Sequence, residues 1–300
     1  MLTFDYNPEW LLAYRTDTLT CIFKLFPYLV SDYFCFLVVA LGYWLRPHKK
    51  LFIALGYLIP VTTISNYLLK NLFAIPRPSS IYHLVPVHDF YGFPSGDVML
   101  ASVFWGMVFC ATKSWGLRIL CASIVISIMA SRIYLGVHSP YDVCGGVFFG
   151  LIIVALWNSN RTQANVSEWY EEHPQTFWII YVSLIIIALE PNGTTLPPVV
   201  MMSIGALLGY GLSLSSIGKT LHEPDTSVPL KETSLKKWIA IGLSSVILVV
   251  IAKVIPMPKD YPMLANLLNF PKYALIIYLT YSVLPRAQRW YCGINGPSQQ

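Results

Sequence analysis

The segment that decides the fold, residues 93–142, reads FPSGDVMLASVFWGMVFCATKSWGLRILCASIVISIMASRIYLGVHSPYD. Two apolar runs, 98–112 and 117–130, lie inside it, with a polar cluster at each end. A helix that crosses a bilayer needs about 20 mostly apolar residues, a length that each run approaches together with its flanks. Two crossings return a chain to the side from which it started. The segment therefore predicts two membrane helices that bring both polar clusters to one face.

A third polar cluster, residues 70–78 (KNLFAIPRP), lies upstream at the end of another apolar run. The loop after that run also contains residues 93–97 (FPSGD), so these two clusters share one side of the membrane. Residues 131–142 (SRIYLGVHSPYD) join them after two further crossings. We therefore expect all three clusters to meet on one surface.

The composition is that of a polytopic membrane protein. Of the 300 residues, 55% are hydrophobic and only 12% are charged, whereas soluble domains carry about 25% charged residues. The mean hydropathy is +0.57. We predict an all-α membrane helical bundle, with residues 1–300 forming a single domain of about nine spans. The predicted spans lie near residues 29–45, 51–70, 97–112, 117–134, 143–158, 176–190, 197–214, 238–255 and 267–284.

Charge and cysteine content argue against binding of nucleic acid, metal or a cofactor. The net charge of +5 is spread over many short loops without a dense basic patch, so we expect no nucleic-acid partner. The six cysteines show no CxxC or other metal-ligand spacing, and we expect no metal or cofactor. The first twenty residues contain charges and no apolar core segment, which is not the pattern of a cleavable signal peptide.

The distribution of lysine and arginine predicts the orientation. Residues 8–28 alternate apolar and polar positions and predict an amphipathic helix in the membrane interface rather than a span. With nine spans, 12 of the 20 Lys and Arg residues fall in one set of loops and 8 in the other. Basic loops face the cytoplasm. The three clusters should then face the periplasm or outside, with a bacterial inner membrane favoured, or the lumen of an organelle such as the endoplasmic reticulum.

Three cations in the clusters, Lys70, Arg77 and Arg132, predict an anion site. Arginine forks match phosphate oxygens bidentately, and Pro78 holds Arg77 in an extended conformation. Each cation alone is better explained as a side chain that reaches toward lipid headgroups. Together on one face, they favour a site for a phosphate group.

The cluster around Ser95 is typical of the start of a helix. Ser95 is a candidate N-cap, and the free N–H groups that follow, including that of Gly96, would face a bound anion. Asp97 falls in the first turn, where its simplest role is to complement the helix dipole.

The pair His138 and Asp142 allows two interpretations. Ser139 and Asp142 have the spacing of a capping box at a helix that begins with Pro140. In the functional interpretation, Asp142 reaches back one turn to a ring nitrogen of His138. The other nitrogen would then be free to act as a nucleophile.

Taken together, these residues resemble the PAP2 superfamily of membrane phosphatidic-acid phosphatases over roughly residues 30–160. The family pattern is Lys-x6-Arg-Pro, then Pro-Ser-Gly-His, then Ser-Arg-x5-His-x3-Asp. The first and third parts match in full, at 70–78 and 131–142. The second part matches at 94–96 and then departs, because Asp97 stands where the family has histidine.

The resemblance implies a six-helix core over about residues 30–190, with additional helices over about 197–284. It implies that His138 attacks phosphorus to form a phosphohistidine and that Asp142 orients it. The implied phosphate-binding residues are Lys70, Arg77, Ser95, Gly96 and Arg132. The implied substrate is a phosphorylated lipid or polyprenyl compound, a monoester or diphosphate, taken from among the membrane lipids and hydrolysed without a metal.

Asp97 leaves the reaction open, because the family's histidine there is the general acid. Asp97 can replace it if it is protonated, or the leaving group can be good enough to need no acid. A third alternative gives the role to His83 or His88, and a fourth is that hydrolysis is lost. Accordingly, a phosphotransferase with the same intermediate and a non-catalytic lipid-phosphate binder or transporter stand beside the phosphatase.

Overall fold

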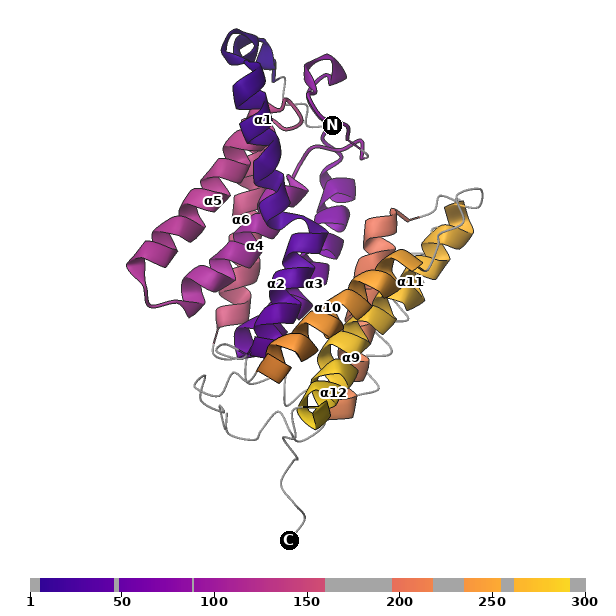
Figure 1. The fold of residues 1–300 in the computed structure, drawn as a ribbon. Coiled ribbons are helices and arrows are strands. Elements are labelled where there is room, and N and C mark those ends of the chain that lie inside the picture. Colours follow the sequence, from indigo (N-terminus) through magenta and orange to yellow (C-terminus); the bar gives the residue numbers. More distant parts are fainter. Residues whose placement is uncertain are drawn as a thin grey trace. The chain divides into compact units, whose positions relative to one another are not determined.

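The computed structural model describes residues 6–45, 49–87, 89–159, 196–217, 235–254 and 262–291. Over these ranges the chain is helical, with no strand beyond one isolated bridge between Pro76 and Tyr91 (Figure 1). The all-α prediction is therefore confirmed. The chain groups into two compact units, Met1–Phe36 with Val61–Glu168, and Leu37–Pro60 with Trp169–Gln300. The single domain remains a prediction.

The site-bearing helices belong to the first unit. They are α1 (Asp17–Leu25), the start of α2 (Asp32–Leu45), the second part of α3 (Lys49–Phe73), α4 (Gly96–Ala111), α5 (Trp115–Tyr134) and α6 (Pro140–Asn158). The second unit holds the rest of α2 and α3 with α9 (Pro198–Ile217), α10 (Leu235–Val254), α11 (Pro262–Tyr278) and α12 (Leu284–Tyr291).

Each predicted span that falls on described residues coincides with a helix, and the span near 176–190 lies outside them. Among the described residues, three helices are long and apolar enough to cross a membrane: Lys50–Phe73, Trp115–Tyr134 and Pro140–Asn158. A fourth crossing results if Asp17–Val30 and Asp32–Leu45, bent by 45°, form one broken span. These apolar helices indicate a membrane protein, and the number of nine spans stays a prediction.

The N-terminal stretch is not the single amphipathic helix that its pattern predicts. It forms a 3-10 turn (Pro8–Tyr14), then α1, then a second 3-10 turn (Phe26–Val30). The first break occurs because Arg15 and Thr16 are extended, and the Thr16 hydroxyl caps α1 by accepting from the Leu19 amide at 3.2 Å. The pattern detected the apolar face but not these interruptions.

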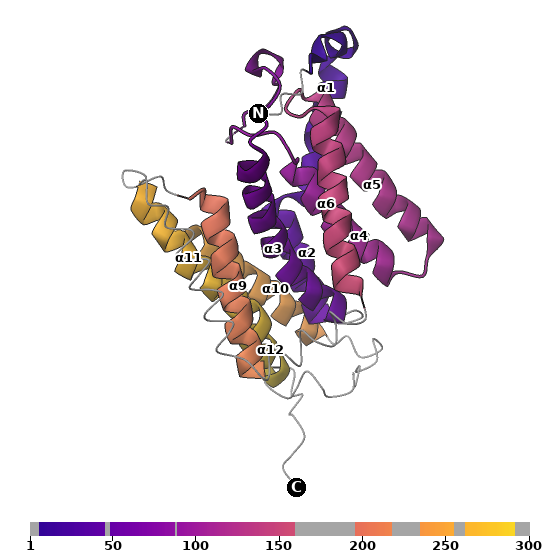
Figure 2. The ribbon, with the colours of Figure 1, turned by 180° about the vertical axis from the view of Figure 1, so that it is seen from behind.

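Small residues let α6 pack closely against α4. A Cβ on Gly146 would lie 2.8 Å from the Ser95 carbonyl oxygen, and one on Gly150 would lie 2.6 Å from the Ser102 side chain. Figures 1 and 2 show α4, α5 and α6 side by side in this unit. This close approach places the start of α6 beside the start of α4.

The loop after α3 folds back over the helix ends. The Gly92 amide donates to the Ile75 carbonyl at 2.8 Å, next to the bridge between Pro76 and Tyr91. Farther along, the Leu84 amide donates to the Leu135 carbonyl at 3.0 Å, just past the end of α5. The loop is therefore held at both α3 and α5.

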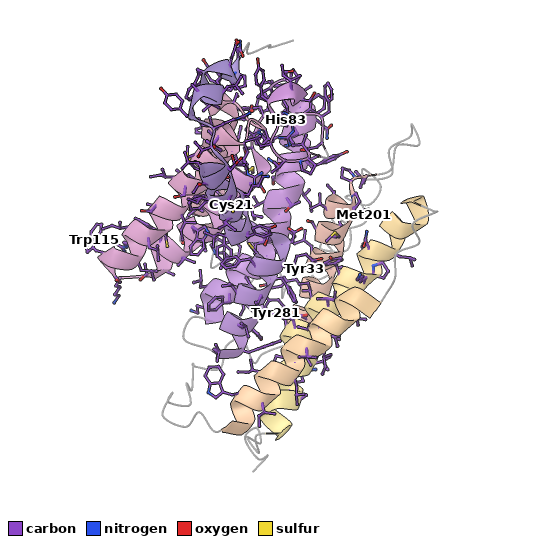
Figure 3. All side chains as sticks on the ribbon, turned by 45° about the horizontal axis from the view of Figure 1, so that its top comes forward. Cys21, Tyr33, His83, Trp115, Met201 and Tyr281 are labelled. Carbon is purple, nitrogen blue, oxygen red and sulfur yellow. The ribbon has the colours of Figure 1, made fainter. Side chains whose placement is uncertain are left out.

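Arg15 secures the same region from the N-terminal side. Its Nη2 donates to the Tyr82 carbonyl at 2.8 Å and to the Tyr134 carbonyl at 3.1 Å. Gly136 makes this contact possible, since it has φ of +74° and a Cβ there would lie 2.1 Å from the Tyr82 oxygen. Figure 3 labels His83 on this loop and Trp115 at the opposite end of α5.

In the second unit, a π-helical turn (Leu279–Val283) joins α11 to α12. Trp44 Nε1 donates to the Thr280 carbonyl at 3.0 Å, and the Tyr43 hydroxyl donates to the Tyr281 carbonyl at 3.4 Å. These side chains satisfy carbonyls in the widened turn.

Candidate active site

The three polar clusters meet where four helix ends come together in the first unit. Arg77 Nη1 lies 2.9 Å from Nε2 of His138, which joins the first cluster to the third. The Ser95 amide donates to the Asp142 carbonyl at 2.9 Å, which joins the second cluster to the third. The convergence predicted from the even number of crossings is thereby confirmed.

His138 and Asp142 form a buried pair, and Asp142 makes both the contact with His138 and the contacts of a capping box. His138 Nδ1 lies 3.3 Å from Asp142 Oδ2. The same carboxylate oxygen accepts from the Ser139 amide at 2.7 Å, and the Ser139 hydroxyl accepts from the Asp142 amide at 3.2 Å. The capping box therefore orients the carboxylate that orients the histidine.

Contacts on both ring nitrogens assign the tautomer of His138. A guanidinium can only donate, so Nε2 accepts from Arg77 and carries the lone pair, while Nδ1 carries the proton toward Asp142. Burial lowers the pKa of His138 to about 4, against the opposing effect of the Asp142 hydrogen bond. The imidazole is thus neutral near pH 7, with the lone pair of Nε2 directed at Arg77.

Lys70 and Arg77 share a carboxylate that the sequence did not single out. Asp89 forms ion pairs through one carboxylate oxygen with Lys70 Nζ and through the other with Arg77 Nη2. Burial raises the pKa of Asp89, but the charges of Lys70 and Arg77 outweigh it and hold that pKa at about 2. The side chain is therefore an ionised carboxylate at working pH. It was missed because a loop residue has no periodic pattern to place it.

Backbone carbonyls complete the coordination of the two cations. Lys70 Nζ donates to the Tyr91 carbonyl at 2.9 Å. Arg77 donates through Nε to the Asp89 carbonyl at 3.0 Å and through Nη1 to the Val137 carbonyl at 2.9 Å. Arg77 therefore spans the distance from the loop to the histidine.

Ser95 is the N-cap residue of α4, as its position predicts, but its side chain does not cap the helix. Its buried Oγ has no hydrogen-bond partner among the described residues. Gly96 begins the helix, and a Cβ there would lie 3.0 Å from Asn66 Oδ1. Asn66, which the sequence did not single out, donates to the Pro94 carbonyl at 3.0 Å. The Ser95 hydroxyl is thus available to an anion at this helix start.

Asp97, in the first turn of α4, is paired with Arg132, in the last turn of α5. Arg132 Nε lies 3.2 Å from Asp97 Oδ2, with the arginine largely buried and the aspartate half-exposed. This contact joins the second and third clusters a second time. The position that departs from the family pattern is therefore held by one of the predicted phosphate-binding residues.

Of the two loop histidines considered as alternative acids, His83 is among the described residues and His88 is not. His83 lies in the loop and donates from Nε2 to the Pro78 carbonyl at 3.0 Å. Burial lowers the pKa of His83. His88 lies outside the described residues. Within those residues, no three His, Cys, Asp or Glu side chains gather in a metal-binding group.

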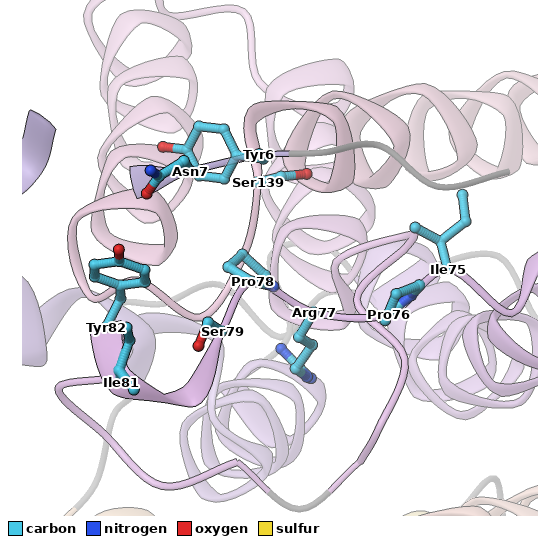
Figure 4. A pocket seen from close by; sticks show the side chains of 10 residues that line it. All are labelled: Tyr6, Asn7, Ile75, Pro76, Arg77, Pro78, Ser79, Ile81, Tyr82 and Ser139. Carbon is cyan, nitrogen blue, oxygen red and sulfur yellow. The ribbon is translucent and has the colours of Figure 1, made fainter. Parts of the chain in front are cut away.

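A cleft of about 400 Å³ opens beside the pair rather than around it. Its wall is formed by the N-terminal segment at Tyr6 and Asn7, the loop from Ile75 to Tyr82, and Ser139. Figure 4 shows Ser139 beside Tyr6, with Pro78 and Arg77 on the neighbouring loop. Arg77 and Ser139 therefore belong to both the cleft and the candidate site.

Comparison with known proteins matches residues 50–165 to the PAP2 superfamily. All eight residues predicted for the site fall within that range. The crystal structure of Aquifex aeolicus LpxE is similar, with 26% sequence identity over 50% of this chain and 90% of that chain, and a TM-score of 0.43. Among curated proteins, none matches the chain in sequence.

Proposed function

We propose that this chain, which carries a PAP2 superfamily domain over residues 50–165, is a multi-pass membrane phosphatase. Its substrate is a phosphate monoester or diphosphate of a lipid or polyprenyl compound. The reaction runs through a phosphohistidine on His138. The observation that carries the proposal is the neutral His138, whose Nε2 faces Arg77 while Nδ1 faces Asp142.

The substrate phosphoryl group binds among the cations. Lys70 and Arg77 hold its oxygens from the loop side, and Arg132 contributes charge from the end of α5. The unpartnered Ser95 hydroxyl and the Gly96 amide donate from the start of α4. Donors arranged in advance around the developing charge are the main source of catalysis in phosphoryl transfer.

In the first step, the Nε2 lone pair of His138 attacks phosphorus. The P–N bond forms as the bond to the leaving oxygen breaks, and that oxygen keeps the electron pair. The imidazole becomes cationic, and Asp142 stabilises it through the Nδ1 proton. In the second step, water attacks phosphorus, the P–N bond breaks, and inorganic phosphate leaves.

The leaving oxygen sets the role of Asp97. A lipid alkoxide needs a proton, which a protonated Asp97 or a histidine of the loop can supply. When the substrate is a diphosphate, the leaving group is the lipid monophosphate, which is a far weaker base than an alkoxide and needs little help. In the first alternative, the carboxyl group that donates the proton is the one that lies 3.2 Å from Arg132 Nε.

The distribution of Lys and Arg supports a site on the non-cytoplasmic face. Modification of a cysteine introduced at Ser80, in the exposed loop beside the site, tests this orientation. A membrane-impermeant thiol reagent should label the Ser80→Cys variant from the outer or lumenal side of sealed vesicles. Labelling only after the vesicles are opened would indicate that the site faces the cytoplasm instead.

Phosphate release by purified protein in detergent tests the proposed function. We expect release from lipid phosphates in the presence of EDTA, inhibition by orthovanadate, and loss of release in His138→Ala. Lys70→Met should raise KM, whereas Lys113→Met, which removes an exposed lysine between α4 and α5, should leave it unchanged. Release that persists in His138→Ala would reject the phosphohistidine.

The same assay separates the other two functions. A phosphotransferase would move labelled phosphate from the donor into a second lipid or sugar instead of releasing it. A binder would retain phosphate without turnover, even in the Asp97→His variant. Turnover gained by Asp97→His would identify a site that lacks only its acid.

A further inference from the structure

The Asp89 carboxylate lies where two of the proposed phosphate-binding cations converge. It pairs with Lys70 through one oxygen and with Arg77 through the other, as two oxygens of a phosphoryl group would. We propose that Asp89 is a resident competing anion, which occupies the Lys70–Arg77 pair when no phosphate is bound and must leave before phosphate can bind. This inference rests on the proposed phosphate site.

The two cations are buried, and this explains why an anion is needed between them. The side chains of Lys70 and Arg77 are 7% and 10% exposed, against 49% for Asp89. Two like charges facing each other with little water would repel one another and lose hydration. A carboxylate supplied by the chain removes that penalty until a phosphoryl group takes its place.

The Asp89 side chain can leave without unfolding the loop. The backbone around it is held by separate bonds, from Arg77 Nε to the Asp89 carbonyl at 3.0 Å and from Lys70 Nζ to the Tyr91 carbonyl at 2.9 Å. The Gly92 amide also donates to the Ile75 carbonyl at 2.8 Å. A rotation of the half-exposed side chain toward water therefore frees both cations.

This exchange weakens binding of every phosphate that uses the pair, including the product. When inorganic phosphate departs, Asp89 returns and neutralises the cations, which favours release. The alternative is that Asp89 only holds Lys70 and Arg77 in place. The two roles predict opposite signs, because removal of a competitor tightens phosphate binding whereas removal of a support weakens it.

Calorimetric titration of the full-length protein in detergent with inorganic phosphate tests the inference. Asp89→Asn should lower the Kd for phosphate by roughly three- to tenfold, the range expected when a partly exposed ion pair no longer competes. Asp89→Ser should act in the same direction, so the test survives if one variant fails to fold. Asp89→Glu restores the charge and should return the Kd toward that of the parent. Asp17→Asn removes an exposed carboxylate from the first turn of α1 and controls for net charge.

An unchanged or higher Kd in both Asp89→Asn and Asp89→Ser would overturn the inference. The proposed function would stand in that case, provided that the parent binds phosphate and Lys70→Met weakens the binding. Absence of phosphate binding in the parent and in all Asp89 variants would overturn the inference and the proposed phosphate site together.

Discussion

Arg77 Nη1 lies 2.9 Å from Nε2 of His138, so a side chain proposed to bind phosphate contacts the nitrogen proposed as the nucleophile. The contact fixes the lone pair on Nε2, while Asp142 fixes the proton on Nδ1. A phosphoryl group bound by Arg77 would thus arrive next to the lone pair. In the proposed mechanism, Arg77 thereby couples substrate binding to the protonation state of His138.

Replacement of Arg77 by lysine should lower kcat/KM by at least about 100-fold. A single ammonium cannot reach the Asp89 carbonyl, the Val137 carbonyl and His138 together, as the fork does. Steady-state kinetics on a lipid phosphate measure the effect. Arg118→Lys is the matched control, because Arg118 lies near the start of α5 and packs over Phe109 and Trp115. Equal activities of Arg77→Lys and the parent would show that the mechanism does not need the guanidinium of Arg77.

Asp142→Asn separates helix capping from catalysis. The amide oxygen of asparagine can still accept from the Ser139 amide, so the thermal midpoint should change little. The same oxygen faces His138 Nδ1, so the tautomer is kept. The neutral amide cannot stabilise the imidazolium that forms as Nε2 attacks phosphorus, and kcat should fall by about 10²–10⁴-fold. A large loss of stability with normal activity per folded molecule would instead assign Asp142 to capping alone.

The pH dependence follows from the lowered pKa of His138. Above about pH 4 the imidazole is neutral and can attack, and below it Nε2 takes a proton. The acid limb of kcat/KM should therefore fall about tenfold per pH unit below about pH 4. Activity lost already near pH 6.5, the ordinary value for histidine, would contradict the buried neutral state.

The same shift affects stability with a definite sign. The unfolded chain takes up a proton on His138 near pH 6.5, whereas the folded chain resists it down to about pH 4. The stabilisation is thus present above pH 6.5 and is lost as the pH falls toward 4. Thermal midpoints of the parent should decline over this window more than those of a His138→Phe variant.

Gly92 should tolerate no side chain. A Cβ at this position would lie 2.9 Å from Asp142 Oδ2 and 3.3 Å from Arg77 Cα, so Gly92→Ala pushes on both the pair and the anion site. We expect a loss of stability of about 1–3 kcal/mol and a kcat lowered more than tenfold. Gly116→Ala, where the nearest atom is 3.8 Å from the added carbon, is the control. Unaltered kinetics in Gly92→Ala would show that the pair can shift freely.

The Asp97→Asn variant tests whether Asp97 is the general acid that protonates the leaving group. If Asp97 protonates the alcohol, kcat on a lipid monoester should fall about 100-fold. On a diphosphate it should fall less than tenfold, because the lipid monophosphate leaves without a proton. Rates on both substrates measured in parallel provide the comparison. Small and equal losses would assign the proton to another group, and His83→Ala then examines the loop histidine.

Local patterns were sufficient to predict the contact between His138 and Asp142. A spacing of four residues at a helix start brings Asp142 back to His138, whatever the rest of the fold does. The capping box depends on the same local geometry. The convergence of the clusters followed from the parity of the crossings, which depends only on the order of the apolar runs.

Other parts of the site depend on contacts between distant segments. The sequence predicts that Lys70 and Arg77 bind an anion, and this stays a prediction. It did not single out the Asp89 carboxylate between them, since the path of the loop through residues 74–92 depends on α3, α5 and α6. Ser95 was correctly placed at the start of α4, yet only the packed structure leaves its hydroxyl unpaired. Arg15 counted only as one charge in the prediction of orientation, whereas in the structure it joins the loop at Tyr82 to the end of α5 at Tyr134.

The sequence by itself determined an all-α apolar chain in which the pair of His138 and Asp142 lies on the same face as the cations. These properties follow from periodicity, spacing and the count of crossings, which a linear pattern carries. Tertiary structure decided that Asp89 pairs with Lys70 and Arg77, that Arg132 pairs with Asp97, and that Asp142 leaves no room for a side chain at position 92. Such contacts arise between loops and helix ends far apart in the chain, where no repeat in the sequence sets the distance.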